Sequence, residues 1–173
     1  RFVFFANQFF NFAAIDLNTK QIAGTIPGDF RFLRVEVFDD GQHRMLALLS
    51  GPGSSGGISA LLLVDATNPS QMTVVKTLSP TSAAYFKFAH DGSRLYVAGN
   101  SQLVAYDLPT FATAWTQTVP ASLTVAHQVS VYGPTDEVLG AWSDGFTPIL
   151  GAFPAFPPNV SATSGLTVDE SAG

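Results

Sequence analysis

The three histidines of this sequence are its first candidates for metal ligands, and their spacing decides whether a metal site is expected. His43 follows an Asp-Gly pair, His90 precedes one, and His127 lies near the start of an alternating apolar run. Zinc requires three or four ligands that converge within about 2.1 Å of one ion. The three histidines occupy different places in the repeat described below, so we predict no metal site, and we place His43 and His90 in surface turns.

The carboxylates do not predict a metal site either, and the sequence does not favour an enzyme. Asp16, Asp65 and Asp107 recur at the ends of apolar runs, but no Asp-x-Asp-x-Asp sequence is present, and calcium needs several carboxylates close together. Capping of a turn by each Asp is the better interpretation. The chain has no cysteine and no His-Glu-x-x-His sequence, and its one Gly-x-Ser-x-Gly match, residues 53–57, falls in a Gly- and Ser-rich stretch that predicts a flexible loop. We therefore predict no catalytic residue and no cofactor, and favour a protein that is not an enzyme.

Composition excludes further classes. The net charge is −5, only 12% of the residues are charged, and lysine occurs three times. Proteins that bind nucleic acids carry a basic stripe, and proteins that bind anionic membranes carry basic clusters, so neither partner is expected. The longest apolar run, residues 58–64, is far too short to span a bilayer.

The candidate residues lie on a repeated pattern of short apolar runs. Asp16, Asp65 and Asp107 close equivalent runs at spacings of 49 and 42 residues, and Asp40-Gly41 and Asp91-Gly92 occupy equivalent turns. Repeats of this length are typical of propeller blades. Alternating β-branched and aromatic runs between turn residues predict strands, and little helix is expected.

Aligning the repeats predicts four strands per unit, named a to d in chain order. Strand a is expected at 32–38, 85–89 and 123–132, and strand b at 2–6, 44–49, 94–99 and 138–142. Strand c is expected at 9–16, 58–65, 102–107 and 147–153, and strand d at 21–26, 72–78 and 112–119. The Asp-Gly pairs fall between strands a and b, where residues with positive φ are preferred.

Two stretches carry a resemblance to a known family. Residues 88–99 (FAHDGSRLYVAG) and 61–69 (LLLVDATNP) are similar to the repeats of bacterial YVTN/LVIVD-like β-propellers. The resemblance covers residues 1–152 and implies an all-β fold of three to three and a half four-stranded antiparallel blades. Propellers usually close with four to eight blades. We therefore expect other chains, or the rest of a longer polypeptide, to complete the ring.

The C-terminal residues suggest a second domain. Residues 153–160 are rich in proline and predict a stiff linker. Residues 161–173 resemble the first strand of a Calx-β or other Ig-like surface domain, and the alternative is a disordered tail. The resemblance implies an extracellular or cell-surface protein.

In such propellers strand a lines the central channel, which makes its polar residues candidates for ligand binding. Arg34 and Glu36 on one blade, Lys87 on the next, and His127 are those candidates. Glu36 and Lys87 have opposite charges, so they either form an ion pair between blades or line a polar channel mouth. A separate candidate is the loop of Trp142 and Asp144, where an exposed aromatic ring could stack on a sugar; the alternative for Trp142 is packing between blades.

We favour a non-enzymatic extracellular or cell-surface propeller segment that acts as a structural or adhesive scaffold and binds protein or carbohydrate through its blade loops. One alternative is part of a propeller enzyme, such as a lactonase-like hydrolase or a quinoprotein-type dehydrogenase, with its ligand at the central channel. Another is a subunit that assembles into rings or filaments through open sheet edges.

Overall fold

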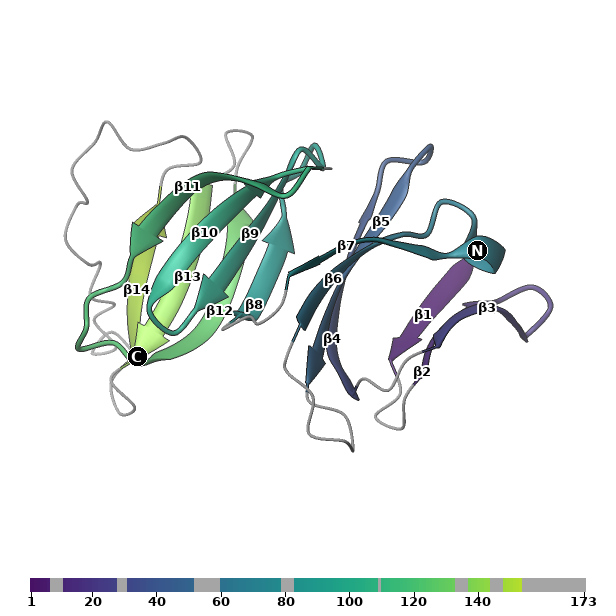
Figure 1. Cartoon of the computed structure of the whole chain (residues 1–173), viewed down its shortest axis with the longest axis horizontal. Helices are drawn as coiled ribbons and strands as arrows, with labels where there is room; N and C mark the ends of the chain where they lie inside the picture. The colour runs from purple at the N-terminus through teal and green to yellow at the C-terminus, as the bar shows by residue number, and fades with distance from the viewer. Residues whose placement is uncertain are drawn as a thin grey trace, which may run out of the picture. The chain divides into compact units, whose positions relative to one another are not determined.

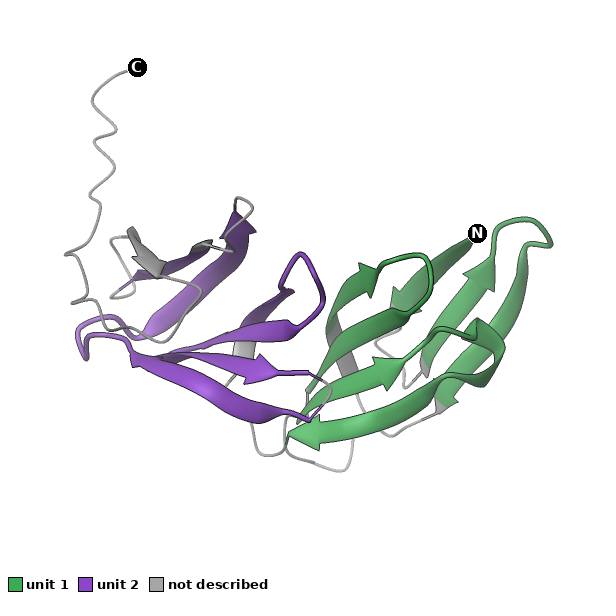
Figure 2. Ribbon diagram, turned by 90° about the horizontal axis from the view of Figure 1, so that it is seen from above, with its two compact units in different colours: residues 1–82 green, residues 83–173 purple. Residues whose placement is uncertain are grey.

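The structure is a computed structural model that describes residues 1–6, 11–27, 31–51, 60–78, 83–108, 110–132, 137–143 and 148–153. The chain divides into two compact units, Arg1–Ser82 and Ala83–Gly173 (Figure 2). The described residues form strands, turns and one short 3-10 helix, with no α-helix. The predicted all-β class is therefore confirmed.

The first unit contains two antiparallel sheets (Figure 1). One has the order β1 (Phe2–Ala6), β2 (Asn11–Asp16), β3 (Gln21–Pro27), and the other the order β4 (Arg31–Asp39), β5 (Arg44–Gly51), β6 (Ala60–Asp65), β7 (Thr73–Leu78). The 3-10 helix η1 (Pro69–Gln71) connects β6 to β7. It starts at Asn68, whose side chain accepts a hydrogen bond from the Ser70 N–H, an interaction that caps its first turn.

The second unit repeats this arrangement. Its four-stranded sheet has β8 (Ala83–Phe88), β9 (Arg94–Gly99), β10 (Gln102–Asp107) and β11 (Ala112–Thr118), and its three-stranded sheet has β12 (Val125–Tyr132), β13 (Glu137–Ser143) and β14 (Pro148–Phe153). In every sheet, strands that are neighbours in space are also consecutive in the chain. This order is possible because antiparallel strands can be joined by short turns.

The predicted order of strands a to d is confirmed in every sheet. The sheets β4–β7 and β8–β11 contain all four strands, β1–β3 contains strands b to d, and β12–β14 contains strands a to c. Gly41 and Gly92 in the Asp-Gly turns have positive φ values of 87° and 71°, as predicted. The 3-10 helix was not predicted. Of the predicted linker and tail, only Phe153, which ends β14, lies within the described residues.

Two irregularities each recur at the same place in three of the four sheets and show that the repeat is structural. Strands c and d slip by one residue between Ala14 and Ile15, between Leu63 and Val64, and between Ala105 and Tyr106. Strands a and b slip between Phe32 and Arg34, between Ala83 and Tyr85, and between Ala126 and Gln128. Because these β-bulges coincide, they define which residues occupy equivalent positions in different sheets.

The Asp residues that end strand c serve the turns in two different ways. Asp16 accepts a hydrogen bond from the Asn18 N–H and Asp65 from the Thr67 N–H, both at 2.9 Å, which confirms turn capping. Asp107 differs from the prediction, because its carboxylate accepts a 3.0 Å hydrogen bond from the Arg94 Nε on the adjacent strand. The residue two positions after Asp107 is Pro109, which has no N–H to donate, so this carboxylate cannot cap its turn as Asp16 and Asp65 do.

Each unit contains a pair of sheets that pack face to face. We call the face of a sheet that carries Leu46 and Leu48, or the residues equivalent to them, its N-side face, and the opposite face its C-side face. In the first unit, Phe12 and Ile26 on the C-side face of β1–β3 pack with Leu46, Leu48 and Val64 on the N-side face of β4–β7. The two pairs of sheets are therefore stabilised mainly by buried apolar area.

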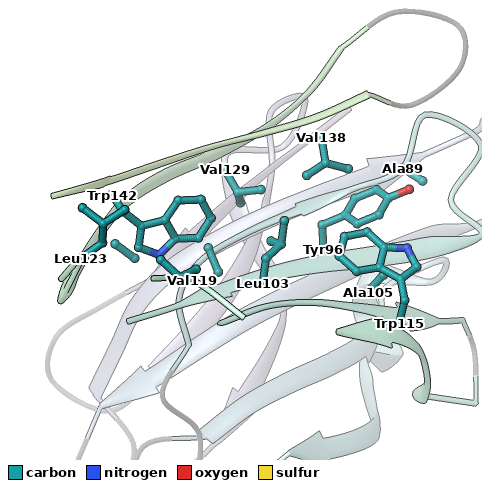
Figure 3. Packing of buried hydrophobic residues seen from close by; sticks show 12 residues of the cluster. Ala89, Tyr96, Leu103, Ala105, Trp115, Val119, Leu123, Val129, Val138 and Trp142 are labelled. Atoms are coloured by element: carbon teal, nitrogen blue, oxygen red, sulfur yellow. The ribbon is translucent and has the colours of Figure 1, made fainter. Parts of the chain in front are cut away.

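The second unit has the larger aromatic core (Figure 3). Tyr96 and Trp115 lie on the C-side face of β8–β11, with ring centroids 6.1 Å apart, and pack with Val138 and Trp142 on the N-side face of β12–β14. Trp142 is 2% exposed, and its Nε1–H donates a 2.9 Å hydrogen bond to the Gly99 carbonyl oxygen. Trp142 therefore packs between the two sheets, which is the alternative given for it in the sequence analysis.

Candidate binding site beside the first strand

A half-open pocket of about 370 Å³ lies within the first unit, between β1 and β4. Its lining consists of Arg1, Phe2, Phe4, Val35, Val37, Asp39 and Arg44. Side chains at alternate positions of a strand share one face, so Phe2 and Phe4 point to the same space, as do Val35 and Val37 opposite them. The pocket therefore has apolar walls and a charged rim.

Arg44 connects the rim to the aromatic wall. Its Nε donates a 2.7 Å hydrogen bond to Asp39 Oδ2, and its Nη2 contacts the same oxygen. Its guanidinium carbon lies 5.8 Å from the ring centroid of Phe2 and 5.6 Å from that of Phe4. Both distances are within cation–π range, so Arg44 holds the two rings and the turn together.

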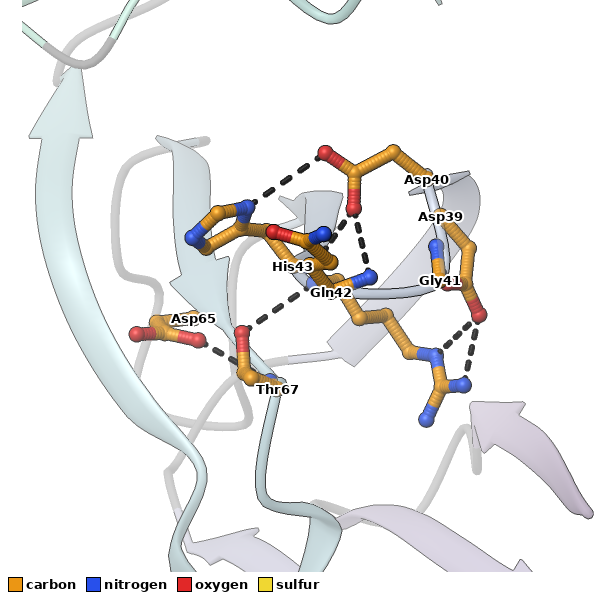
Figure 4. A network of polar contacts seen from close by, with 8 residues as sticks. Asp39, Asp40, Gly41, Gln42, His43, Asp65 and Thr67 are labelled. Atoms are coloured by element: carbon orange, nitrogen blue, oxygen red, sulfur yellow. Dashed lines mark hydrogen bonds and ion pairs between the residues drawn. The ribbon is translucent and has the colours of Figure 1, made fainter.

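The β4–β5 turn positions the carboxylate of Asp39 on this rim and that of the neighbouring Asp40, which does not line the pocket (Figure 4). Asp39 accepts a hydrogen bond from the Gly41 N–H at 2.9 Å, and Asp40 accepts from the N–H groups of His43 and Gln42 at 2.6 and 2.8 Å. The Gly41 N–H and then Arg44 hold the pKa of Asp39 below its ordinary value of 3.8. The N–H groups of His43 and Gln42 lower the pKa of Asp40 in the same way.

These lowered pKa values predict that the first unit loses stability in acid. An Asp with a folded pKa below 3.8 is fully stabilising above the pKa of the unfolded chain, and the contribution is lost as the pH falls through the folded pKa, because the unfolded state then binds more protons. In urea titrations at pH 7, 5, 3 and 2, we expect Asp39→Asn to be less stable than the wild type at pH 7, and the two stabilities to converge in acid. An equal difference at pH 7 and well below pH 3 would show that the Asp39 charge contributes nothing.

The strand that contributes Phe2 and Phe4 to the pocket, β1, has one neighbouring strand among the described residues, whereas the equivalent strand in each of the other three sheets has two. β1 is a strand b, because Phe2 pairs with Asp16 as Met45 pairs with Asp65 and Arg94 with Asp107. In each of the other sheets strand b pairs with a strand a, whereas no strand within the described ranges pairs with the outer edge of β1.

The backbone of β1 is oriented to receive such a strand. The Leu17 N–H donates to the Arg1 carbonyl oxygen at 2.9 Å, so the N–H and C=O groups of Arg1, Val3 and Phe5 are directed toward β2. Because the direction alternates along an antiparallel strand, the N–H and C=O of Phe4 are directed toward the open edge. An extended segment could therefore pair with β1 and place a side chain in the pocket.

The predicted site residues on strand a occupy equivalent positions but are distributed over both units. Arg34 follows the bulge of β4 as Gln128 follows that of β12, and Glu36 and Lys87 are equivalent to each other. Arg34, Glu36 and Lys87 are half-buried. Glu36 belongs to the first unit and Lys87 to the second, so the ion pair between them, and the channel mouth, stay predictions.

His127 is the extra residue of the β-bulge in β12, and its side chain is directed toward Ser143 on β13. Its Nε2 lies 2.6 Å from Ser143 Oγ, while Ser143 itself is 3% exposed. A serine hydroxyl next to an imidazole is the arrangement of a nucleophile and its base, but a buried hydroxyl cannot reach a substrate. The contact anchors the bulge, and a role for His127 in ligand binding stays a prediction.

The loop predicted to stack on a sugar does not offer Trp142 for that purpose. Its indole ring is buried in the core, and only 2% of the residue is exposed, so the prediction of a stacking ring at Trp142 is wrong. The reason is that a large apolar ring gains more from burial against the neighbouring sheet than from water contact. Asp144 lies outside the described residues.

Other predicted sites can be compared directly. His43 lies in the β4–β5 turn with a 69% exposed side chain, as predicted. Across the described ranges, no group of three or more His, Asp and Glu side chains is placed to hold a metal ion. In the same residues, no helix is long and apolar enough to cross a membrane.

The sequence interpretation missed the pocket residues Asp39 and Arg44. The available signal was an Asp and an Arg on either side of the Asp40-Gly41 turn, together with the alternation of Phe2 and Phe4. Neither signal states that the two sheets meet at this point, so the pocket could not be located without their packing.

Comparison with known proteins identifies the fold. No protein-family model matches the sequence, and no curated protein matches it. The structure is similar to the β-propeller domain of Cps50 (Swd1) from Myceliophteria thermophila, with a TM-score of 0.65 and 16% identity over 94% of this chain and 50% of that chain. It is similar to a functionally unknown protein from Desulfotomaculum acetoxidans, with a TM-score of 0.69 and 13% identity over 90% of this chain and 47% of that one.

A third similar structure is BBS1N, solved in complex with ARL6DN, with a TM-score of 0.61 and 15% identity over 90% of this chain and 47% of that one. This chain thus has the fold of β-propeller blades and spans about half the length of the chains it matches. The predicted propeller fold is confirmed. Membership of the YVTN/LVIVD-like group and the Calx-β-like tail stay predictions.

Proposed function

We propose that this segment is a non-enzymatic binding scaffold that holds an extended segment of a partner protein beside β1. The observation that supports the proposal is a strand b that lines an apolar pocket with Phe2 and Phe4 and whose outer edge is unpaired among the described residues, whereas strand a pairs with that edge in the other three sheets. Addition of a strand to an open edge provides affinity through main-chain hydrogen bonds and specificity through pockets for alternate side chains. The similar BBS1N structure contains a protein partner, which agrees with this class of function.

The pocket chemistry defines the segment that it accepts. Phe2, Phe4, Val35 and Val37 favour one branched or aromatic side chain, whose burial supplies about 1.5–3 kcal/mol. Asp39 and Arg44 already form a charged pair, so a polar neutral residue beside the anchor suits the rim better than a charged one.

The experiment is selection of peptides from a random display library on the full chain, followed by affinity measurement with Val37→Lys. Val37 is 41% exposed and lines the pocket, so the lysine should weaken binding of the selected peptides by about tenfold or more, a loss of about 1.4 kcal/mol, without unfolding the protein. The matched control is Val75→Lys, which is 47% exposed on β7 and does not line the pocket. Peptides that bind both variants equally would contradict the proposal.

We further propose an extracellular or cell-surface location, which rests on the low charge, the few lysines and the surface-domain-like tail. Digestion of intact source cells by an added protease, followed by detection of this segment with an antibody, tests it. Persistence of the segment on intact cells, with digestion only after lysis, would contradict this location.

The alternative functions receive less support. Carbohydrate binding depended on an exposed ring at Trp142, which is buried. The enzyme alternatives depended on strand a, where the His127 contact is to a buried hydroxyl.

A further inference from the structure

The N-side face of the first sheet is exposed at positions that are buried in the other sheets. Val3 is 45% exposed, whereas the equivalent residues Leu46, Leu95 and Val138 are each 0% exposed. The equivalence follows from register, because Val3, Leu46 and Leu95 all pair with the residue before the Asp that ends strand c. Val138 pairs with strand a as Leu46 and Leu95 do.

The same contrast holds along the strand but not at Ile22 on β3, because the equivalent Val74 on β7 is itself 44% exposed. Phe5 is 51% exposed, whereas its equivalents Leu48 and Val97 are 0% and 6% exposed. Val3 pairs with Ile15, and Ile15 with Ile22, which is 65% exposed. An apolar row therefore crosses all three strands of this face, and exposed apolar patches on soluble proteins mark interaction surfaces.

On the last sheet, it is the C-side face that carries apolar residues more exposed than their equivalents in other sheets. Tyr132 on β12 is 67% exposed, whereas the equivalent Ala89 is 2% exposed. Leu139 on β13 is partly buried, whereas its equivalents Ala47 and Tyr96 are 0% and 1% exposed. Val125, on the same face, is 39% exposed.

The open N-side face and the open C-side face are of the same two kinds as the faces that pack together inside each unit. In each unit, the C-side face of one sheet packs on the N-side face of the sheet that follows it. Of the nine large apolar residues that are exposed among the described ones, five lie on the open N-side face (Val3, Phe5, Ile22) or the open C-side face (Val125, Tyr132).

We propose that a second copy of this chain covers them, with the N-side face of the first sheet of one copy on the C-side face of the last sheet of the other. The chain spans 50%, 47% and 47% of the propeller chains that it resembles, so two copies supply the length of one such chain. Twice the four sheets of the described residues is eight, within the four to eight blades of known propellers. A head-to-tail contact of this kind closes when the rotation between copies permits it.

The test is the solution mass of the full chain by light scattering and sedimentation, at about 1 to 100 μM. The proposal predicts a dimer of twice 18.3 kDa. Either Val3→Lys with Phe5→Lys, or Tyr132→Lys, should give a monomer with unchanged circular dichroism, because these side chains are exposed in the single chain. The control is Val74→Lys with Val75→Lys, which are 44% and 47% exposed on β7 and should leave the dimer intact.

A mixture of the two interface variants distinguishes this contact from non-specific association. Each variant keeps the face that the other has lost, so the mixture should form a heterodimer through one intact contact, although neither variant associates alone. A monomeric wild type at every concentration, dimers that survive the lysine changes, or a mixture that stays monomeric would each overturn the proposal. It does not depend on the binding site beside β1, since Val37→Lys should leave the dimer unchanged.

Discussion

Gly140→Ala is expected to destabilise the second unit by about 3 kcal/mol, near the upper end for overpacking a core. An added Cβ at Gly140 would lie 2.0 Å from Cζ3 and 2.2 Å from Cη2 of Trp142. The indole ring has little room to move, because it is 2% exposed and its Nε1–H is bonded to the Gly99 carbonyl oxygen. Urea unfolding followed by tryptophan fluorescence measures the change.

The control for this prediction is the same alanine in a Trp142→Leu background. Removing the ring is itself costly, but it leaves space for the new methyl group, so Gly140→Ala should then cost less than about 1 kcal/mol. The double-mutant cycle should show a coupling of about 2 kcal/mol between the two positions. An equal loss of unfolding free energy in both backgrounds would show that the Trp142 indole ring is not what excludes a side chain at Gly140.

Gly24→Ala is expected to destabilise the first unit by about 2 kcal/mol or more, because here the obstacle is backbone. An added Cβ would lie 2.1 Å from the Pro69 carbonyl oxygen and 3.1 Å from both the Pro69 carbonyl carbon and the Ser70 Cα. The 3-10 helix η1 would have to move away from β3 to make room. The free energy of unfolding in urea, and amide hydrogen exchange at Ser70 and Gln71, report the two consequences.

Thr25→Ala provides the matched comparison on the same strand. Thr25 is exposed and adjacent to Gly24, so its change to alanine should alter the free energy of unfolding by less than about 0.5 kcal/mol. Equal effects of the two substitutions would mean that β3 tolerates no alanine for a local reason, and that the contact with η1 is not responsible.

Much of the strand order followed from local features of the sequence. The alternation of apolar and polar residues and the turns at Asp40-Gly41 and Asp91-Gly92 are properties of a few neighbouring residues. They were sufficient to predict strands a to d, with β9 and β10 at their observed bounds. The capping roles of Asp16 and Asp65 followed for the same reason, because an Asp side chain reaches only N–H groups close to it in the chain.

Other features depended on contacts between strands. The hydrogen bond from Arg94 to the Asp107 carboxylate depends on the register of β9 against β10, which places these two residues opposite each other; the sequence states only that Pro109, two positions after Asp107, has no N–H to donate. The bulge that carries His127 also arises from the pairing of two strands, so its contact with Ser143 has no local signature.

The sequence by itself determined an all-β chain of repeated antiparallel strands. Only the tertiary structure decided that Trp142 is core and that Phe4 and Val37 line a pocket, because burial depends on which sheet packs on which face. Alternation states which residues share a face, and does not state whether that face is covered. For this reason Val3 and Leu46 are alike in the sequence pattern, while one is 45% exposed and the other is fully buried.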